Sequence, residues 1–207
     1  MADVLLYQAR EFDLSDIEGL SPQNLAVHLR VYRQHVEEVN RLLQARAKGP
    51  QLVPIPVPVL AGQYALAPSS APASQLAHEY NGMVLHELFF EELTGALGAV
   101  PPREGALRIA ATRCFGSLEA WQSDLKQLVE TRGVGWAACM RERSGNRIFN
   151  CWIGAHEVGV PAATDPLLVI DFWEHAWLPD YGPGQRAEYF QTVLAQIDWA
   201  VVERRFL

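Results

Sequence analysis

The chain has 207 residues, of which 49% are apolar and 20% charged, a composition typical of a soluble globular protein with one core or two small lobes. Its formal net charge of -7 argues against nucleic acid as a partner, because phosphate binding needs a basic surface. Cys114, Cys139 and Cys151 are an odd number without a short paired spacing, which favours free thiols over a disulfide framework or a CxxC zinc site. No leader sequence and no apolar run of membrane-spanning length is evident, so we expect a cytoplasmic protein that does not enter membranes.

Two long helices are expected in the first half. The first begins with Ser21 as N-cap and Pro22 at the first helical position, and Gly49-Pro50 ends it. Residues 50–72 carry six prolines, which favours an extended connector lying on the surface. A second amphipathic helix is predicted from Ser74, as its cap, to Leu97.

The second half predicts short helices around a small sheet. Two strands that bracket the turn at 143–146 form a hairpin signature, and the apolar run Pro166–Ile170 indicates a buried third strand. Two long helices followed by a sheet with helices around it indicate an α+β fold. The other predicted segments are helices at 104–115, 118–130 (capped by Ser117), 185–190 and 189–205, and hairpin strands at 135–140 and 147–153.

Four residues stand out as candidate metal ligands. Asp171 and His175 lie four residues apart where the buried strand should turn into a helix, and such a pair suits iron, manganese or zinc. His28 lies among the apolar positions of the first helix. His86 lies in an apolar stretch of the second helix that would strip water from an imidazole unless a polar group meets it.

The segment Asp171-Phe172-Trp173-Glu174-His175-Ala176 resembles the signature of the iron/manganese superoxide dismutases. Residues 21–40, with His28, and 85–90, with His86, resemble the two ligand-bearing helices of that family. Residues 133–136 resemble the glycine-x-glycine-tryptophan that opens its sheet, and 189–199 its closing helix.

The resemblance implies a helical hairpin domain (1–99, with the Pro-rich connector 50–72) followed by an α/β domain (100–207) with a three-stranded antiparallel sheet. It further implies one iron or manganese ion per chain, iron being slightly preferred, bound by His28, His86, Asp171 and His175. Superoxide would be the small anionic substrate, and the assembly a homodimer or a dimer of dimers.

The surroundings of the expected site depart from the family pattern. His156 takes the position of a family glutamine, and we assign it as the donor to the bound solvent; Gly82 occupies the alternative glutamine position. Tyr32 is a candidate donor into the channel, whereas the family's gateway tyrosine falls at Val36. Leu178 replaces a further tyrosine. By resemblance, Trp136, Trp173 and Phe90 wall the site, and Glu174 reaches His175 of a partner subunit.

Two rival functions differ from this interpretation. A carboxylate-bridged di-iron protein needs Glu-x-x-His pairs, but Met83 and Phe172 precede the two candidate histidines by three residues. A metal-binding or interaction module with little dismutase activity would suit the altered surroundings and the Pro-rich segment. The metal content separates this module from the enzyme.

Overall fold

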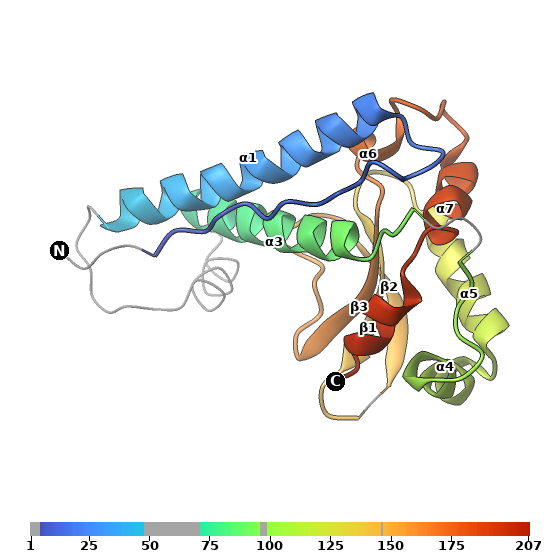
Figure 1. Cartoon of the computed structure of the whole chain (residues 1–207). Helices are drawn as coiled ribbons and strands as arrows, with labels where there is room; N and C mark the ends of the chain where they lie inside the picture. The colour runs from blue at the N-terminus through green and yellow to red at the C-terminus, as the bar shows by residue number, and fades with distance from the viewer. Residues whose placement is uncertain (1–4, 48–70, 96–98, 146) are drawn as a thin grey trace.

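The computed structural model describes residues 5–47, 71–95, 99–145 and 147–207, so most of the Pro-rich connector lies outside the described residues (Figure 1). The α+β fold is confirmed: long helices come first, and a domain with a three-stranded antiparallel sheet follows. The division at residue 99 stays a prediction. The elements are α1 (Pro22–Ala47), α3 (Ala71–Glu91), α4 (Ala106–Phe115), α5 (Leu118–Gln127), the 3-10 turn η1 (Leu128–Glu130), β1 (Trp136–Glu142), β2 (Ile148–Ile153), β3 (Thr164–Asp171), α6 (Glu174–Trp177), α7 (Arg186–Leu194) and α8 (Trp199–Arg204).

Helices α1 and α3 form a long pair that extends from the sheet domain (Figure 1). The predicted cap of α1 is confirmed, because the Ser21 hydroxyl accepts a hydrogen bond from the Asn24 amide at 3.1 Å. Between Tyr7 and Arg10 the N-terminal segment runs along this pair. Tyr7 exchanges hydrogen bonds with the Asn40 side chain, and the Arg10 amide donates to the Tyr32 hydroxyl.

The bounds of the second long helix differ from the prediction. It begins at Ala71, so position 74 lies inside the helix and not before its first residue. Proline at position 72 is compatible with this start, because the first helical turn leaves its amides unpaired in any case. The helix ends at Glu91, earlier than predicted, because the chain then pairs with a distant segment: Leu93 forms an antiparallel bridge with Ile197.

The sheet has the order β2-β1-β3, and both pairings are antiparallel. Trp136 at the start of β1 pairs with Asp171 at the end of β3, which places the carboxylate beside the tryptophan. Pro166 is accommodated because β3 is an edge strand and the register shifts at Cys139/Met140, opposite the proline.

The C-terminal helical region is interrupted, in contrast to the continuous stretch predicted over 189–205. Helix α7 ends at Leu194, and α8 begins only at Trp199. The Asp198 carboxylate caps α8 by accepting from the Ala200 amide, while the Asp198 amide donates to the Glu92 carbonyl. The helix is therefore interrupted where residues 197 and 198 pair with the segment after α3.

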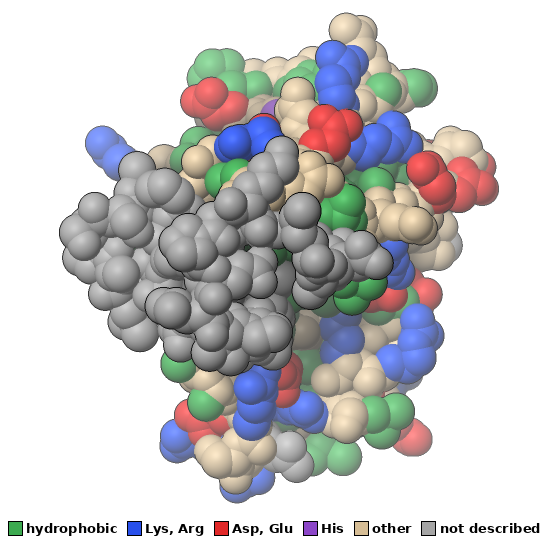
Figure 2. All heavy atoms as spheres, turned by 90° about the vertical axis from the view of Figure 1, so that its left-hand side faces the viewer, with side chains coloured by type: hydrophobic (Ala, Val, Ile, Leu, Met, Phe, Trp, Pro, Cys, Tyr) green, Lys and Arg blue, Asp and Glu red, His purple; other side chains and the backbone are tan. Residues whose placement is uncertain are grey.

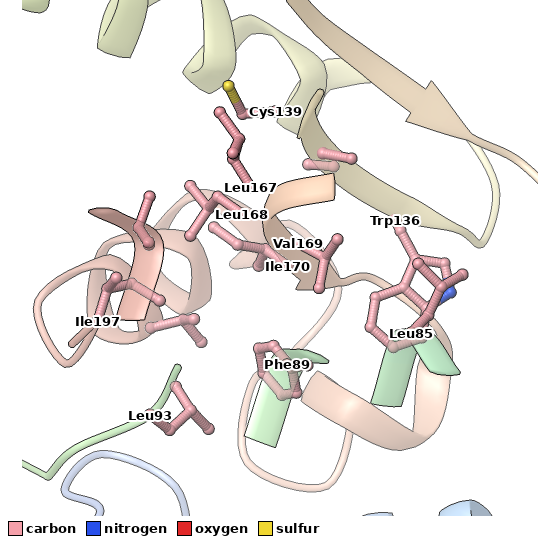
Figure 3. Packing of buried hydrophobic residues seen from close by; sticks show 14 of the residues in the cluster. Leu85, Phe89, Leu93, Trp136, Cys139, Leu167, Leu168, Val169, Ile170 and Ile197 are labelled. Carbon is pink, nitrogen blue, oxygen red and sulfur yellow. The ribbon is translucent and has the colours of Figure 1, made fainter. Parts of the chain in front are cut away.

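The main core lies where α3 and the segment around Ile197 meet β1 and β3 (Figure 3). Phe89, Leu168 and Val169 are fully or almost fully buried there, which anchors the inner end of the long pair on the sheet. Within the described part of the chain, no helix combines the length and apolarity that crossing a membrane requires.

Candidate metal centre

Four elements bring the four candidate ligands together at the inner end of the long helix pair. His28 comes from α1, His86 from α3, Asp171 from the last position of β3 and His175 from α6. One ligand atom of each lies within 4.8 Å of those of the other three. Asn24, one turn before His28, donates to the Ala176 carbonyl at 3.1 Å and thereby holds α1 against α6.

The Asp171 carboxylate is the centre of this cluster. Its Oδ2 lies 3.0 Å from His28 Nε2, 3.2 Å from His175 Nε2 and 3.6 Å from His86 Nε2. Its Oδ1 accepts a hydrogen bond from the Trp173 amide at 2.7 Å, which fixes the orientation of the carboxylate. Three imidazole nitrogens therefore face one carboxylate oxygen.

The protonation states suit a cation. Burial lowers the pKa of His28 and lowers the pKa of His86 well below its ordinary value, so both rings are neutral and keep a lone pair. Burial by itself would raise the pKa of Asp171, but the charge of His175 and the hydrogen bonds from His175 and His28 hold it well below its usual range. The donor set therefore includes one carboxylate and the two neutral imidazoles of His28 and His86.

These residues fit an iron or manganese ion. Asp171 is fully buried, and a buried carboxylate needs a cation or several donors to offset its lost hydration. His86 Nδ1 donates to the Gly82 carbonyl at 2.6 Å, which leaves Nε2 free to face Asp171 and His175. Imidazole and carboxylate together suit divalent first-row ions, and these ligands alone do not select between iron and manganese.

Aromatic rings lie around the cluster. The Trp136 ring lies 5.0 Å from the His86 ring, and the Phe90 ring 4.8 Å from the His28 ring, both edge to face. Trp173 is half-buried and packs against the His156 ring at 4.8 Å. These rings exclude water from most of the surroundings of the four ligands.

Neither Glu174 nor Tyr32 forms a side-chain hydrogen bond with the four candidate ligands within the described residues. Glu174 is exposed on α6, next to His175. The Tyr32 hydroxyl donates to the Glu87 carboxylate at 2.8 Å while accepting from the Arg10 amide. Its known hydrogen bonds are thus with the N-terminal segment and α3, and its predicted role as a donor into the channel rests on the resemblance alone.

His156 lies beside the cluster, with its ring 6.2 Å from that of His86. It is only 1% exposed, and neither of its ring nitrogens has a hydrogen-bond partner among the described residues. Burial, together with the neighbouring His35 and His78, lowers its pKa to about 3, so the ring is neutral. The backbone of this loop is held by Asn81, which donates to the His156 carbonyl.

His35 and His78 pack around His156, and the sequence analysis assigned neither of them a role. A signal was present in their spacing. His35 follows His28 by seven residues on α1, and His78 precedes His86 by eight on α3, so each lies on the same helix face as a candidate ligand. What the spacing could not show is that a loop from the sheet domain brings a third imidazole between them.

Gly82 leaves the space that two of these rings fill. A Cβ at this position would lie 2.8 Å from His156 Nδ1 and 2.8 Å from His35 Cε1. We expect Gly82→Ala to lower the free energy of unfolding by about 1–3 kcal/mol, because the added methyl group overpacks this space. The higher helix propensity of alanine should offset up to about 1 kcal/mol of that loss.

Urea denaturation of Gly82→Ala, His156→Ala and the double variant measures this contact. The double variant should be more stable than the sum of the single effects allows, with a coupling of at least about 0.5 kcal/mol. Additive effects would show that the His156 ring does not occupy the space beside Gly82.

The helical pair, the three-stranded sheet and the buried cluster of three histidines and one aspartate define a class of α+β proteins with a site that could hold one metal ion. Comparison with known sequences identifies the class. Residues 103–205 match the sequence model of the iron/manganese superoxide dismutases, C-terminal domain.

Individual relatives extend the match beyond that domain. The chain is 30% identical over 140 residues to superoxide dismutase [Mn] 1 of Halobacterium salinarum, covering 68% of each chain. It is 30% identical over 131 residues to superoxide dismutase [Mn] 2 of Haloferax volcanii, covering 63% of this chain and 64% of the relative. It is 33% identical over 128 residues to superoxide dismutase [Fe] of Cupriavidus metallidurans, covering 61% and 62%. The matched region thus spans less than two thirds of the last two relatives.

The chain belongs to the iron/manganese superoxide dismutase family, as the residues around Asp171 indicated. The relatives include proteins named for manganese and for iron, so they do not select the metal.

Proposed function

We propose that this protein is a superoxide dismutase that binds one iron or manganese ion through His28, His86, Asp171 and His175. The observation that carries the proposal is the convergence of these four ligand atoms within 4.8 Å of one another, in a chain of this family. When bound, the ion would supply the one-electron oxidation and reduction that dismutation requires.

The protein's own groups prepare the site for an anionic substrate. The donor set carries one negative charge, that of Asp171, against the charge of a divalent or trivalent ion, so the loaded site attracts superoxide. The chain's net charge of -7 does not oppose this, because a local positive focus can coexist with a negative total. On the face drawn in Figure 2, basic and acidic side chains are interspersed over the described residues.

His156 is proposed to hold a proton for the reaction. The peroxide product needs two protons, and the neutral ring carries one N–H with no partner among the described residues. Its packing against Trp173 and against the neighbouring imidazoles fixes the ring beside the four ligands. Val36, at the position of the family's gateway tyrosine, is almost fully buried and can hold no proton.

We further propose a cytoplasmic homodimer or dimer of dimers in which Glu174 accepts a hydrogen bond from His175 of the partner subunit. The exposed position of Glu174 and the partly exposed Leu178 on the same side of α6 support this arrangement. A partner carboxylate would orient this ligand and make metal binding depend on dimerisation.

The proposal predicts dismutase activity in the metal-loaded protein. Superoxide removal is measured for chains loaded separately with iron and with manganese, each beside an equal concentration of free metal. We expect at least one loaded form, iron by preference, to be faster than the free ion. His156→Gln should change the ratio of iron to manganese activity by about 10-fold or more, because groups next to the ligands tune the metal. Loaded protein no faster than the free ions would contradict the assignment, and chains that take up no metal would favour the interaction module.

A further inference from the structure

The six histidines of the chain form two groups of three. The first group is His28, His86 and His175, with ring centroids 4.9–5.5 Å apart. The second group, here called the outer triad, is His35, His78 and His156. Its ring centroids lie 4.6 Å (His78–His156), 5.2 Å (His35–His156) and 5.9 Å (His35–His78) apart. The ring centroids of the two groups are therefore separated by similar distances, whereas within the described residues only the first group has ligand atoms within 4.8 Å of one another.

Two carboxylates orient the outer triad. Glu79 Oε2 lies 2.6 Å from His35 Nδ1, and Glu157 Oε2 lies 2.7 Å from His78 Nδ1. In each pair Nδ1–H donates to the carboxylate, so Nε2 is the nitrogen left to bind a metal ion. A carboxylate on the far nitrogen is the usual partner of a metal-binding histidine, because it fixes the tautomer and raises the basicity of the ligand.

The third ring has no such partner. His156 is 1% exposed, and both of its nitrogens lack a hydrogen bond within the described parts of the chain. Leaving these polar atoms unpaired in the interior costs free energy, and no hydrogen bond restrains the ring from turning. Gly82 provides the room for the ring, and its absent Cβ would lie 2.8 Å from His156 Nδ1 and 2.9 Å from His35 Nδ1.

An acidic surface pocket borders one member of the outer triad, His35. It has a volume of about 420 Å³ and is lined by His35 and by three carboxylates. A pocket of this sign concentrates cations and repels anions, so it is unsuited to superoxide and suited to a metal ion. The residues that line it are Val31, Gln34, His35, Glu37, Glu38 and Glu79.

We propose that His35, His78 and His156 form a second metal site, for one divalent first-row ion of the kind that imidazole ligands favour, such as Zn²⁺, Co²⁺, Ni²⁺ or Cu²⁺. Three protein nitrogens leave at least one coordination position open. Because an imidazole has two nitrogens, His156 can bind this ion through one and face the first cluster with the other. The second site does not require a redox-active metal in the cluster around Asp171. It can therefore be tested separately from the dismutase proposal.

Zinc binding to the metal-loaded protein tests the second site. The chain carrying its iron or manganese is titrated with Zn²⁺ by calorimetry, and the zinc, iron and manganese bound per chain are measured after gel filtration. We expect one Zn²⁺ per chain to bind while the first metal is retained. His78→Gln should weaken this binding at least 100-fold, and Glu157→Gln should weaken it about 10–100-fold through loss of the orienting carboxylate. The His78 side chain is 31% exposed, so its replacement should leave the fold intact, which circular dichroism checks.

Two controls separate this proposal from the dismutase proposal. Asp171→Asn should lose the first metal and keep the Zn²⁺ that depends on His78. With Cu²⁺ as the probe, electron paramagnetic resonance should show hyperfine coupling to three nitrogens in the wild type and to two in His78→Gln. Equal zinc affinity in wild type and His78→Gln would overturn the second site, as would the absence of Zn²⁺ uptake beyond replacement of the first metal.

Discussion

Asp171→Asn is expected to abolish stable metal binding while leaving the fold in place. The substitution removes the only negative charge among the four candidate ligands. Oδ2 of Asp171 lies 3.0–3.6 Å from three imidazole nitrogens. The loss of affinity should exceed the roughly 10–100-fold that loss of an orienting partner costs, because a direct ligand is removed.

The loss of metal binding in Asp171→Asn should lower the thermal stability as well as the metal content. A metal present at about 1,000 times its dissociation constant stabilises the folded wild type by about 4 kcal/mol. Thermal denaturation with and without added Mn²⁺ should show this stabilisation in the wild type and almost none in Asp171→Asn.

Asp165→Asn is the matched control, because this aspartate lies on the same strand but pairs with Arg141 and Arg143 near the surface. Its loss should cost less than about 1 kcal/mol and leave metal binding unchanged. If Asp171→Asn kept the same stabilisation by Mn²⁺ as the control, the four-ligand assignment would be wrong.

Arg205→Leu is expected to destabilise the protein by about 3–5 kcal/mol, the largest effect on folding that we predict. The guanidinium, only 11% exposed, pairs with the fully buried Glu92 carboxylate. It also donates to the Leu167 carbonyl at 2.9 Å and to the Leu88 carbonyl at 2.7 Å. It thus ties α3 and β3 to the segment after α8, and its removal leaves a buried carboxylate without its cation.

Urea denaturation measures this loss. The double variant Glu92→Leu/Arg205→Leu should recover part of it, because no unpaired carboxylate remains, although the two carbonyls still lose their donor. Arg143→Leu removes an arginine whose side chain is 65% exposed and should cost no more than about 1 kcal/mol. If Arg205→Leu lost as little stability as Arg143→Leu, the pair of Arg205 and Glu92 would not hold α3 and β3 to the segment after α8.

The sequence by itself indicated the class of fold and four candidate ligands, and the resemblance of residues 171–176 indicated the family. The fold and the candidates rest on local signals: Ser21 before Pro22 starts a helix, and an aspartate four residues before a histidine follows a buried apolar run. Such signals need only neighbouring residues, because capping and burial periodicity act over a few residues.

The tertiary structure decided the features that depend on distant partners. The second long helix ends at Glu91 and the last helical region breaks after Leu194, because residues 93 and 197 pair across the molecule. Likewise, His156 meets two imidazoles from α1 and α3 only because the packing of the sheet against the helix pair brings its loop there. Contacts between segments this far apart arise from the burial of shared apolar surface and the register of the strands, which no short stretch of sequence specifies.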